Sequence, residues 1–338
     1  MNGELTEWFE VKSGTGQGDI QGPPVFNVCM NLVMELVEFY KRVSKGMLLE
    51  KSWCPEVRDV TVVDVDYADD LAALDNTKEG LQETTDLIVK YSAYSGLAVN
   101  VGKTEAMAVS KQASQMPYTE NDTLAISIGD EIVKQCSEFK YLGAIICGDN
   151  NLDKELTARI GKATGAFNRL NNIWNSRSIS ISVKLRIYKA AVNTVLTYGC
   201  EVWNTTQAQM KRLESFHQRC LRRILKVRWF HRVTNVEVLR RASTTPLESH
   251  VASMRLRWYG HAVRMPGDRL PHYLVDWVPK HGKRNRGRPK KSWLKVVEED
   301  FNHVTGSADA THLDMKILAV DRNRWKITLD AAGNSAVT

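Results

Sequence analysis

The chain lacks a secretion signal, a long apolar run and closely spaced cysteines. Its first residues have no basic start followed by an apolar stretch, and no segment approaches roughly 18 uncharged apolar residues. The six cysteines lie far apart, without the close pairs that a zinc site needs. We therefore expect neither secretion nor membrane insertion, and predict an intracellular protein of the nucleus, the cytoplasm or both, with reduced thiols that mostly fill core positions.

A folded protein is indicated by what the sequence does contain. Its 338 residues are enough for two or three units, each with its own core. A hydrophobic content of 43%, a charged content of 25% and 9 Trp are typical of a globular chain and argue against a disordered or fibrous one.

The net charge of +7 hides a strong asymmetry along the chain. Residues 211–300 hold 22 Lys and Arg against 8 Asp and Glu, a net charge of +14, which leaves −7 for the rest. This pattern suits a protein that holds cations in one region and a polyanion in another. A plain solvated basic surface is the alternative.

Short strands and helices alternate up to about residue 150. Two β-branched runs between residues 57 and 73 meet at an acidic turn, which predicts a hairpin. Apolar spacing predicts helices over residues 26–43 and 78–94, the second ending near Gly96. These features predict an α+β unit.

Helical patterns dominate after residue 150. We expect helices over residues 152–176, 183–198 and 208–227, a short one after the capping pattern at Thr234, one from Pro246 to about 265, and a last one over 292–304. Residues 279–291 are rich in Gly, Pro, Lys and Arg and are expected to form an exposed linker.

The strongest chemical signal is the acidic turn at Asp66-Tyr67-Ala68-Asp69-Asp70-Leu71. Adjacent carboxylates repel each other, and a fold tolerates them most readily where a divalent cation neutralises them. Mg²⁺ is the expected cation because it combines few carboxylates with phosphate oxygens and water, and Mn²⁺ is the alternative. Ordinary hairpin-turn chemistry also explains an Asp-Asp pair, so the dipeptide alone leaves both readings open.

Four motifs follow one another along the chain: residues 14–27 (GTGQGDIQGPPVFN), 67–70 (YADD), 96–104 (GLAVNVGKT) and 139–143 (FKYLG). In sequence and in order they resemble the motifs of reverse transcriptases. Three later segments, residues 198–203, 257–261 and 286–293, resemble those of endonuclease-encoding non-LTR (LINE-type) retrotransposons.

The resemblance implies a partial reverse-transcriptase palm, an antiparallel sheet with packed helices, in residues 1–150. A mostly helical, thumb-like domain would follow in 151–230, and a basic helical nucleic-acid-binding region in 231–304. A partly disordered tail would occupy 305–338. The implied partners are an RNA template, a DNA primer or target, and deoxynucleoside triphosphates.

Roles for individual residues also come from the resemblance. Asp69 and Asp70 would ligate the metal ions of an RNA-directed DNA polymerase, and Lys103 would lie near the triphosphate. As an exposed lysine after glycine, Lys103 also has the simpler interpretation of a solvated charge. Nucleotide and template would contact Gln17, Gly18, Tyr67 and Ala68, and the primer would be gripped by Tyr141, Leu142 and Gly143.

The sequence departs from the resembled pattern before residue 14. Two-metal polymerases need a further carboxylate on a separate strand, and residues 1–13 do not match the aromatic and aspartate pattern expected there. We infer a truncated element, a partial gene model or an expressed fragment, without fingers or endonuclease. We accordingly expect this chain to catalyse no DNA synthesis by itself.

The basic tail predicts contacts with nucleic acid. Its core, residues 285–291, resembles an AT-hook that lies in a narrow minor groove, while a nuclear-import patch and a solvated linker remain alternatives. Near these cations, Trp258 and Trp293 could stack on unpaired bases, or lie in helical cores, which the spacing of Trp293 favours. The nucleic-acid-binding set comprises Arg257, Trp258, His261, Arg286, Arg288, Lys290 and Lys291.

Three functional classes therefore remain open at this point. The chain is a polymerase by descent that needs additional residues, a non-catalytic nucleic-acid-binding remnant of a transposon, or an inert transposon-derived product. Salt-dependent binding of RNA or DNA separates the second class from the third, because phosphate contacts weaken steeply as the salt concentration rises.

Overall fold

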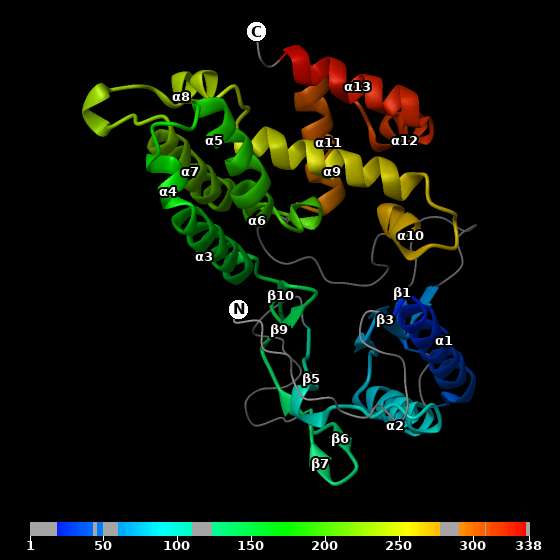
Figure 1. The fold of residues 1–338 in the computed structure, drawn as a ribbon. Helices are drawn as coiled ribbons and strands as arrows, with labels where there is room; N and C mark the ends of the chain where they lie inside the picture. The colour runs from blue at the N-terminus through cyan, green and yellow to red at the C-terminus, as the bar shows by residue number, and fades with distance from the viewer. Residues whose placement is uncertain are drawn as a thin grey trace. The chain divides into compact units, whose positions relative to one another are not determined.

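A computed structural model describes residues 19–42, 46–49, 60–109, 124–277, 291–307 and 309–335, with side chains as far as residue 330. The chain divides into two compact units, residues 1–142 and residues 143–338 (Figure 1). Helices and short strands are both present, which confirms the mixed α+β class. The predicted division at residues 150, 230 and 304 stays a prediction.

The first unit contains two long helices, α1 (Gly22–Tyr40) and α2 (Lys78–Tyr94). α2 begins at Thr77, whose side chain accepts a hydrogen bond from the Gly80 amide. The two helices pack through a small apolar cluster built on Val33, Val37, Ile88 and Tyr91. Both predicted helices are confirmed, although the buried face of α1 is not the stripe of apolar residues that marked it in the sequence.

The strands of the first unit are two to four residues long. They are β1 (Met47–Leu49), β2 (Val60–Val62), β3 (Asp64–Tyr67), β4 (Asp70–Ala73), β5 (Glu105–Ala106), β6 (Ser127–Ile128), β7 (Glu131–Ile132), β8 (Lys134–Gln135) and β9 (Glu138–Tyr141). β1–β2, β3–β4 and β6–β7 pair antiparallel, and β5–β8 pair parallel. The described part of this unit therefore holds short two-stranded pairs, most of them antiparallel, beside two packed helices. The palm that the resemblance implies stays a prediction.

Two of these pairs are tight hairpins that the helices hold in place. Leu71 and Ala73 of β4 pack on the cluster between α1 and α2. The Gln82 side chain of α2 makes two hydrogen bonds of 2.8 Å to the backbone of Ser127, at the start of the β6–β7 hairpin. Both hairpins are thus anchored at the base, and their tips remain exposed.

The second unit begins with β10 (Ala144–Cys147) and is otherwise helical. Its helices are α3 (Asp153–Arg169), α4 (Asn171–Asn175), α5 (Ile181–Tyr188), η3 (Lys189–Asn193), α6 (Thr194–Leu196), η4 (Cys200–Val202), α7 (Gln207–Ile224), η5 (Trp229–His231), α8 (Asn235–Arg241), α9 (Leu247–Val263), α10 (Leu270–Asp276), α11 (Trp293–Thr305), α12 (His312–Val320) and α13 (Arg322–Ser335). The helices predicted in this region are confirmed, with breaks at Leu170 and at η3, a π-helical turn.

α9 connects two apolar cores within this unit. One core packs α3 to α8 around residues such as Trp174, Leu213 and Leu221, and includes the start of α9 at Leu247 and Val251. The other packs the later part of α9 against α11, α12 and α13 (Figure 1). The end of α9 therefore lies in a core of its own, distinct from the first.

The approach of α13 to α9 depends on a glycine. The Trp325 indole nitrogen donates a hydrogen bond of 3.1 Å to the Leu256 carbonyl oxygen, and a Cβ atom on Gly260 would lie 2.4 Å from that nitrogen. No side chain fits between the two helices at this point, which explains the glycine of the motif at residues 257–261.

Residues 309–335 contain two helices, α12 and α13, that the sequence analysis does not predict. α12 begins with a capping box in which Thr311 and Asp314 bond each other's backbone amides. Met315, Ala319 and Trp325 are buried in the second core. The spacing of these apolar residues is the signal for the two helices that the sequence analysis missed.

Candidate functional site: an acidic hairpin tip

The turn between β3 and β4 consists of two residues, Ala68 and Asp69. Tyr67 and Asp70 pair directly across the hairpin on either side of it. Ala68 has φ of 56°, in the left-handed region that short hairpin turns need and that glycine adopts more easily. A non-glycine residue there costs roughly 1–2 kcal/mol of backbone strain. The tip therefore holds its two adjacent carboxylates in a fixed and slightly strained geometry.

The two faces of the hairpin carry different carboxylates. Side chains alternate along a strand, so Tyr67 and Asp70 lie on one face while Asp64 and Asp66 lie on the other, with Leu71 opposite Asp66. The face of the hairpin that carries Leu71 packs on the apolar cluster between α1 and α2. Asp69 and Asp70 are exposed, and Asp64 is half-buried.

The acidic environment is visible at Asp64. Its pKa is raised above the ordinary value, first by burial and then by the negative charges of Asp66 and Glu38. Sequence reasoning missed Asp64. The signal was the alternation Asp64-Val65-Asp66, which places both carboxylates on one face of a strand.

Tyr141 fastens β9 to the acidic hairpin. Its hydroxyl donates to the Val65 carbonyl oxygen at 2.9 Å, and the Asp70 carbonyl oxygen is 3.4 Å away. The pKa of Tyr141 is raised above its ordinary value, first by burial and then by the negative charges of Asp70, Asp66 and Asp64. The structure thus brings together two segments 71 residues apart that the sequence analysis assigned to metal binding and to primer binding.

Leu142 and Gly143 follow Tyr141 in left-handed backbone conformations, with φ of 47° and 83°. Within the second unit, the Gly143 carbonyl oxygen accepts hydrogen bonds from Arg159 at 2.6 Å and Lys162 at 3.2 Å, both on α3. Arg159 in turn pairs with Glu155 and is buried. The backbone at Gly143, the first residue of the second unit, is therefore held by charged side chains of α3.

Lys103 ends a short 3₁₀ turn, η1 (Val101–Lys103), and its side chain is exposed. The Asn100 side chain accepts a hydrogen bond from the Lys103 amide at 3.2 Å. No hydrogen bond joins the Lys103 ammonium group to the hairpin carboxylates, all of which lie in the described part of the chain. The structure gives it a fixed backbone but no contact with Asp69 or Asp70.

Several predicted site residues lie outside the described residues. They are Gln17, Gly18, Arg286, Arg288 and Lys290.

The later nucleic-acid candidates divide between surface and core. Arg257 and His261 are exposed on α9, whereas the neighbouring Tyr259 and Gly260 are buried. Trp258 is partly buried and lines an apolar pocket with Val202, Ala262 and Trp293. Three segments singled out in the sequence, around residues 202, 258 and 293, therefore meet at one place in the second unit.

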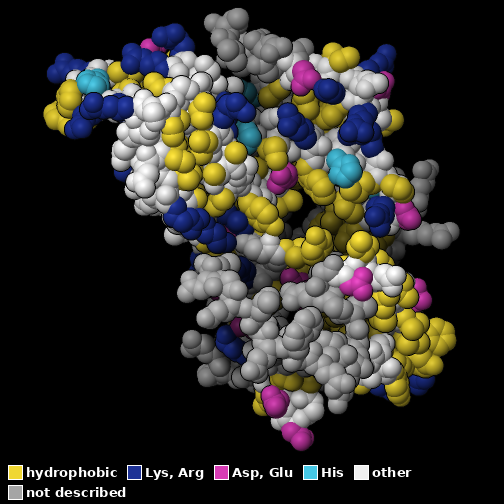
Figure 2. Space-filling model, viewed as in Figure 1, with side chains coloured by type: hydrophobic (Ala, Val, Ile, Leu, Met, Phe, Trp, Pro, Cys, Tyr) yellow, Lys and Arg dark blue, Asp and Glu magenta, His cyan; other side chains and the backbone are white. Residues whose placement is uncertain are grey.

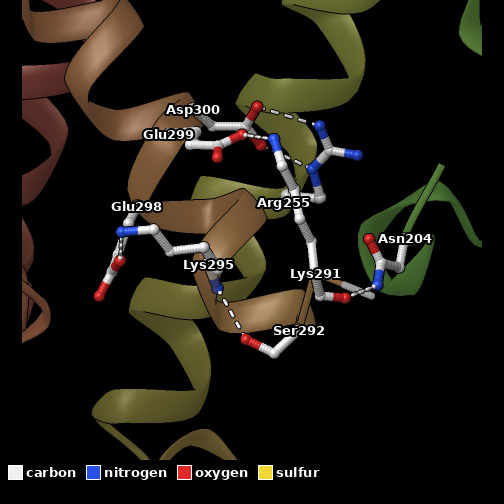
Figure 3. Close-up of polar contacts among 8 residues, drawn as sticks. All are labelled: Asn204, Arg255, Lys291, Ser292, Lys295, Glu298, Glu299 and Asp300. Carbon is white, nitrogen blue, oxygen red and sulfur yellow. Dashed lines mark hydrogen bonds and ion pairs between the residues drawn. The ribbon is translucent and has the colours of Figure 1, made fainter. Parts of the chain in front are cut away.

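Trp293 and Lys291 have structural partners, and those of Lys291 are drawn in Figure 3. The Trp293 indole donates to the Glu201 carbonyl oxygen at 2.9 Å, as expected for a packed helical residue. Lys291 pairs with Glu299 at 2.6 Å, and its carbonyl oxygen accepts from Asn204. Beside it, Arg255 forms a buried bidentate pair with Asp300 that joins α9 to α11. The Lys291 pair is half-exposed and is worth little, about 0–1 kcal/mol.

Asp69 and Asp70 offer carboxylate oxygens, the ligands that hard divalent cations prefer, and neither forms an ion pair with a described residue. Among the described residues there is, however, no group of three or more His, Cys, Asp or Glu side chains that could hold a metal ion. Two carboxylates could supply only part of the ligand shell of a Mg²⁺ ion, whose other ligands would be phosphate oxygens and water. None of the helices in the described ranges has the length and apolarity to cross a membrane.

Comparison with known proteins agrees with these motifs. Residues 1–146 match the family described as reverse transcriptase (RNA-dependent DNA polymerase), and residues 166–198 match a domain of unknown function. A transposon-derived protein of Caenorhabditis elegans is 26% identical over 267 residues, covering 77% of this chain and 92% of that protein.

A second relative is the RNA-directed DNA polymerase from the mobile element jockey of Drosophila melanogaster. It is 22% identical over 241 residues, which cover 67% of this chain and 23% of that polymerase. These matches support reverse-transcriptase ancestry and a relation to retrotransposons of the non-LTR type.

Proposed function

We propose that this chain acts as part of the polymerase of a non-LTR retrotransposon, in which it binds template, primer and nucleotide. Its proposed Mg²⁺ ligands are Asp69 and Asp70. The observation that carries the proposal is the Tyr141 hydroxyl on the backbone of the acidic hairpin. It joins the candidate metal ligands to the candidate primer grip at hydrogen-bond distance. In this reading residues 1–150 are palm-like and residues 151–230 are thumb-like.

The residues of the tip have separate tasks in the proposal. Asp69 and Asp70 hold the cation, which when bound neutralises phosphate charge. Tyr67 stands across the hairpin from Asp70 on the exposed face and offers an aromatic surface beside it. Tyr141 positions the hairpin, and Lys103 contributes a positive charge to the triphosphate. Gln17 and Gly18 would complete the pocket for nucleotide and template, and Leu142 and Gly143 would extend the primer grip.

We further propose that this chain does not extend a primer by itself. Two-metal transfer needs carboxylates that bridge both cations from two sides. The described residues offer Asp69 and Asp70 at the tip, while Asp64 and Asp66 lie on the opposite face of the hairpin. One Mg²⁺ with a bound triphosphate fits this set, and a second metal lacks ligands among the described residues.

Calorimetric titration with a deoxynucleoside triphosphate tests the binding proposal. We expect binding that requires Mg²⁺ and that D69N/D70N weakens at least about tenfold, which is about 1.4 kcal/mol, because the cation loses both of its carboxylate ligands. Asp130 and Glu131 provide the matched control, since they are adjacent exposed carboxylates at the tip of the β6–β7 hairpin. If D130N/E131Q weakens binding as much, general charge explains the effect and the proposal fails.

Primer extension tests the second part. The purified chain is incubated with Mg²⁺, an RNA template with an annealed DNA primer and all four deoxynucleotides, and we expect no product. Robust extension that D69N abolishes would show a complete polymerase site and refute the inactivity of the chain alone.

Binding without catalysis is the second candidate function. The observation in its favour is the excess of 22 basic over 8 acidic residues in residues 211–300. Steep weakening of RNA or duplex DNA binding with rising salt, unchanged in D69N/D70N, supports this reading, whereas salt-independent or absent binding contradicts it.

A further inference from the structure

An aromatic loop projects from the second unit between α7 and α8. We define the aromatic loop as residues 226–233, which include the short turn η5. Its tip consists of Trp229, Phe230 and His231, all exposed, with 89% of the Trp229 surface and 55% of the Phe230 surface accessible. A single exposed aromatic side chain is ordinary on a folded surface, but a contiguous exposed cluster of them marks a contact site.

The three rings are arranged at right angles. Trp229 meets Phe230 edge-on, with ring centroids 5.8 Å apart, and Phe230 meets His231 in the same way at 4.5 Å. In an edge-on pair neither ring stacks face to face on the other. Because nearly all of its surface is also accessible, Trp229 has a flat face free for another planar group.

The base of the aromatic loop is fixed by the helices on both sides. Val227 is buried, and its amide donates to the Arg222 carbonyl oxygen at 2.9 Å. The Arg222 guanidinium donates hydrogen bonds to the far end of the loop. Its acceptors are the Val233 carbonyl oxygen at 2.9 Å and the Asn235 side chain at 2.8 Å. Because the loop is closed at its base, its tip has few conformations available. Binding therefore costs little conformational entropy.

Positive charge surrounds the rings. Lys226, Arg228 and Arg232 are exposed, and within the described ranges none of them pairs with a carboxylate. Residues 211–241 contain 10 Lys and Arg but only two acidic residues, and one of these, Glu237, is paired with Arg240 and Arg241. Figure 2 shows basic, hydrophobic and histidine side chains gathered at this projecting tip.

We propose that the aromatic loop binds an unpaired strand of nucleic acid. Trp229 stacks on a base, and Lys226, Arg228 and Arg232 bind the flanking phosphates. Aromatic faces interleaved with basic side chains fit a single strand, because every base has a planar face and every linkage a negative charge. This inference rests on the proposed handling of nucleic acid but not on metal binding or catalysis.

An anionic membrane surface is the competing partner for a projecting Trp among cations. Nucleic acid is the better match for two reasons. The apolar tip consists of only two residues, Trp229 and Phe230, and basic residues precede and follow it in the sequence. Membrane-binding elements instead present a continuous apolar face.

The test measures binding of the full chain to a fluorescent 20-nucleotide RNA without secondary structure, and to a blunt duplex of the same sequence. W229A should weaken binding to the single strand about tenfold and to the duplex less than about twofold, whereas W229F should retain most of the affinity. R228A/R232A should lower the slope of log K against log salt concentration by about 1.4, since two phosphate contacts are lost.

V236A is the control for folding and for exposed apolar surface. Val236 is 77% exposed on the adjoining α8, and its truncation should leave RNA binding unchanged. Wild-type affinity of W229A for the single strand overturns the proposal, as does an equal loss on the duplex. A W229A defect confined to vesicles of phosphatidylserine and phosphatidylcholine also overturns it. The W229A effect should persist in a D69N/D70N background, which separates this site from the acidic hairpin.

Discussion

Two hairpins of the first unit carry adjacent carboxylates at nearly identical positions. In the β3–β4 hairpin, Ala68 and Asp69 form the turn and Asp70 begins the next strand; in the β6–β7 hairpin, Gly129 and Asp130 form the turn and Glu131 follows. The first turn residue is left-handed in both, with φ of 56° and 60°. Two adjacent acids at a hairpin tip are therefore not enough to identify a metal site.

The surroundings distinguish the two hairpins. The β3–β4 hairpin adds Asp64 and Asp66, receives the Tyr141 hydroxyl, and places alanine where glycine would fit without strain. The β6–β7 hairpin is fastened by Gln82 at its base and has glycine in the strained position. Strain that persists at one of two matched turns is typical of a site kept for function.

The first prediction exchanges the turn residues. G129A should destabilise the β6–β7 hairpin by roughly 1–2 kcal/mol, because a Cβ atom there meets no neighbour within 4 Å and the cost is backbone strain alone. A68G should instead stabilise the β3–β4 hairpin by up to about 1 kcal/mol. Hydrogen exchange of residues 64–73 and 127–132 measures both. Equal destabilisation by the two variants would mean that the hairpins are not strained in the way described.

The second prediction removes the Tyr141 hydroxyl. Y141F keeps the ring and loses the hydrogen bond to Val65, so exchange protection of the β3–β4 hairpin should fall by about 1 kcal/mol. Protection of the β6–β7 hairpin should not change, because Gln82 anchors it separately. Loss of protection in both hairpins would indicate general unfolding.

The third and smallest effect concerns pH. The folded-state pKa of Asp64 is raised, so the folded chain binds this proton more tightly than the unfolded chain does. The free energy of unfolding therefore falls as the pH rises from 3.8, the ordinary pKa of an aspartate, through the raised pKa of Asp64, because the folded chain must then hold the charged carboxylate. D64N should melt at a higher temperature than the wild type at pH 7, with the difference vanishing as the pH approaches 4. A difference independent of pH would contradict the electrostatic cause.

The amino-acid sequence predicted those elements that have local signals. α2 follows from the Thr77 cap and the stop at Gly96, and α8 follows from Thr234, whose side chain accepts from the Glu237 amide as the capping pattern requires. The acidic turn was also predictable, since a β-branched run leads into it and the apolar residues Leu71, Ala72 and Ala73 follow it. Each of these depends on contacts within a few residues of the signal.

Other features depend on distant partners and were not predictable in this way. Val33 and Val37 of α1 are buried, because they are the residues that pack against α2. Val28 and Phe39, whose apolar spacing predicts the helix, are exposed. The Tyr141 contact spans 71 residues. Gly260 has its role only because Trp325 packs against it.

We propose that the β3–β4 tip, and not the β6–β7 tip, holds a divalent cation. Electron paramagnetic resonance of Mn²⁺ with the full chain and a deoxynucleoside triphosphate tests this directly. We expect a protein-bound ion that is released in D69N/D70N and retained in D130N/E131Q. Retention of the ion by D69N/D70N would show that the β3–β4 tip does not bind it.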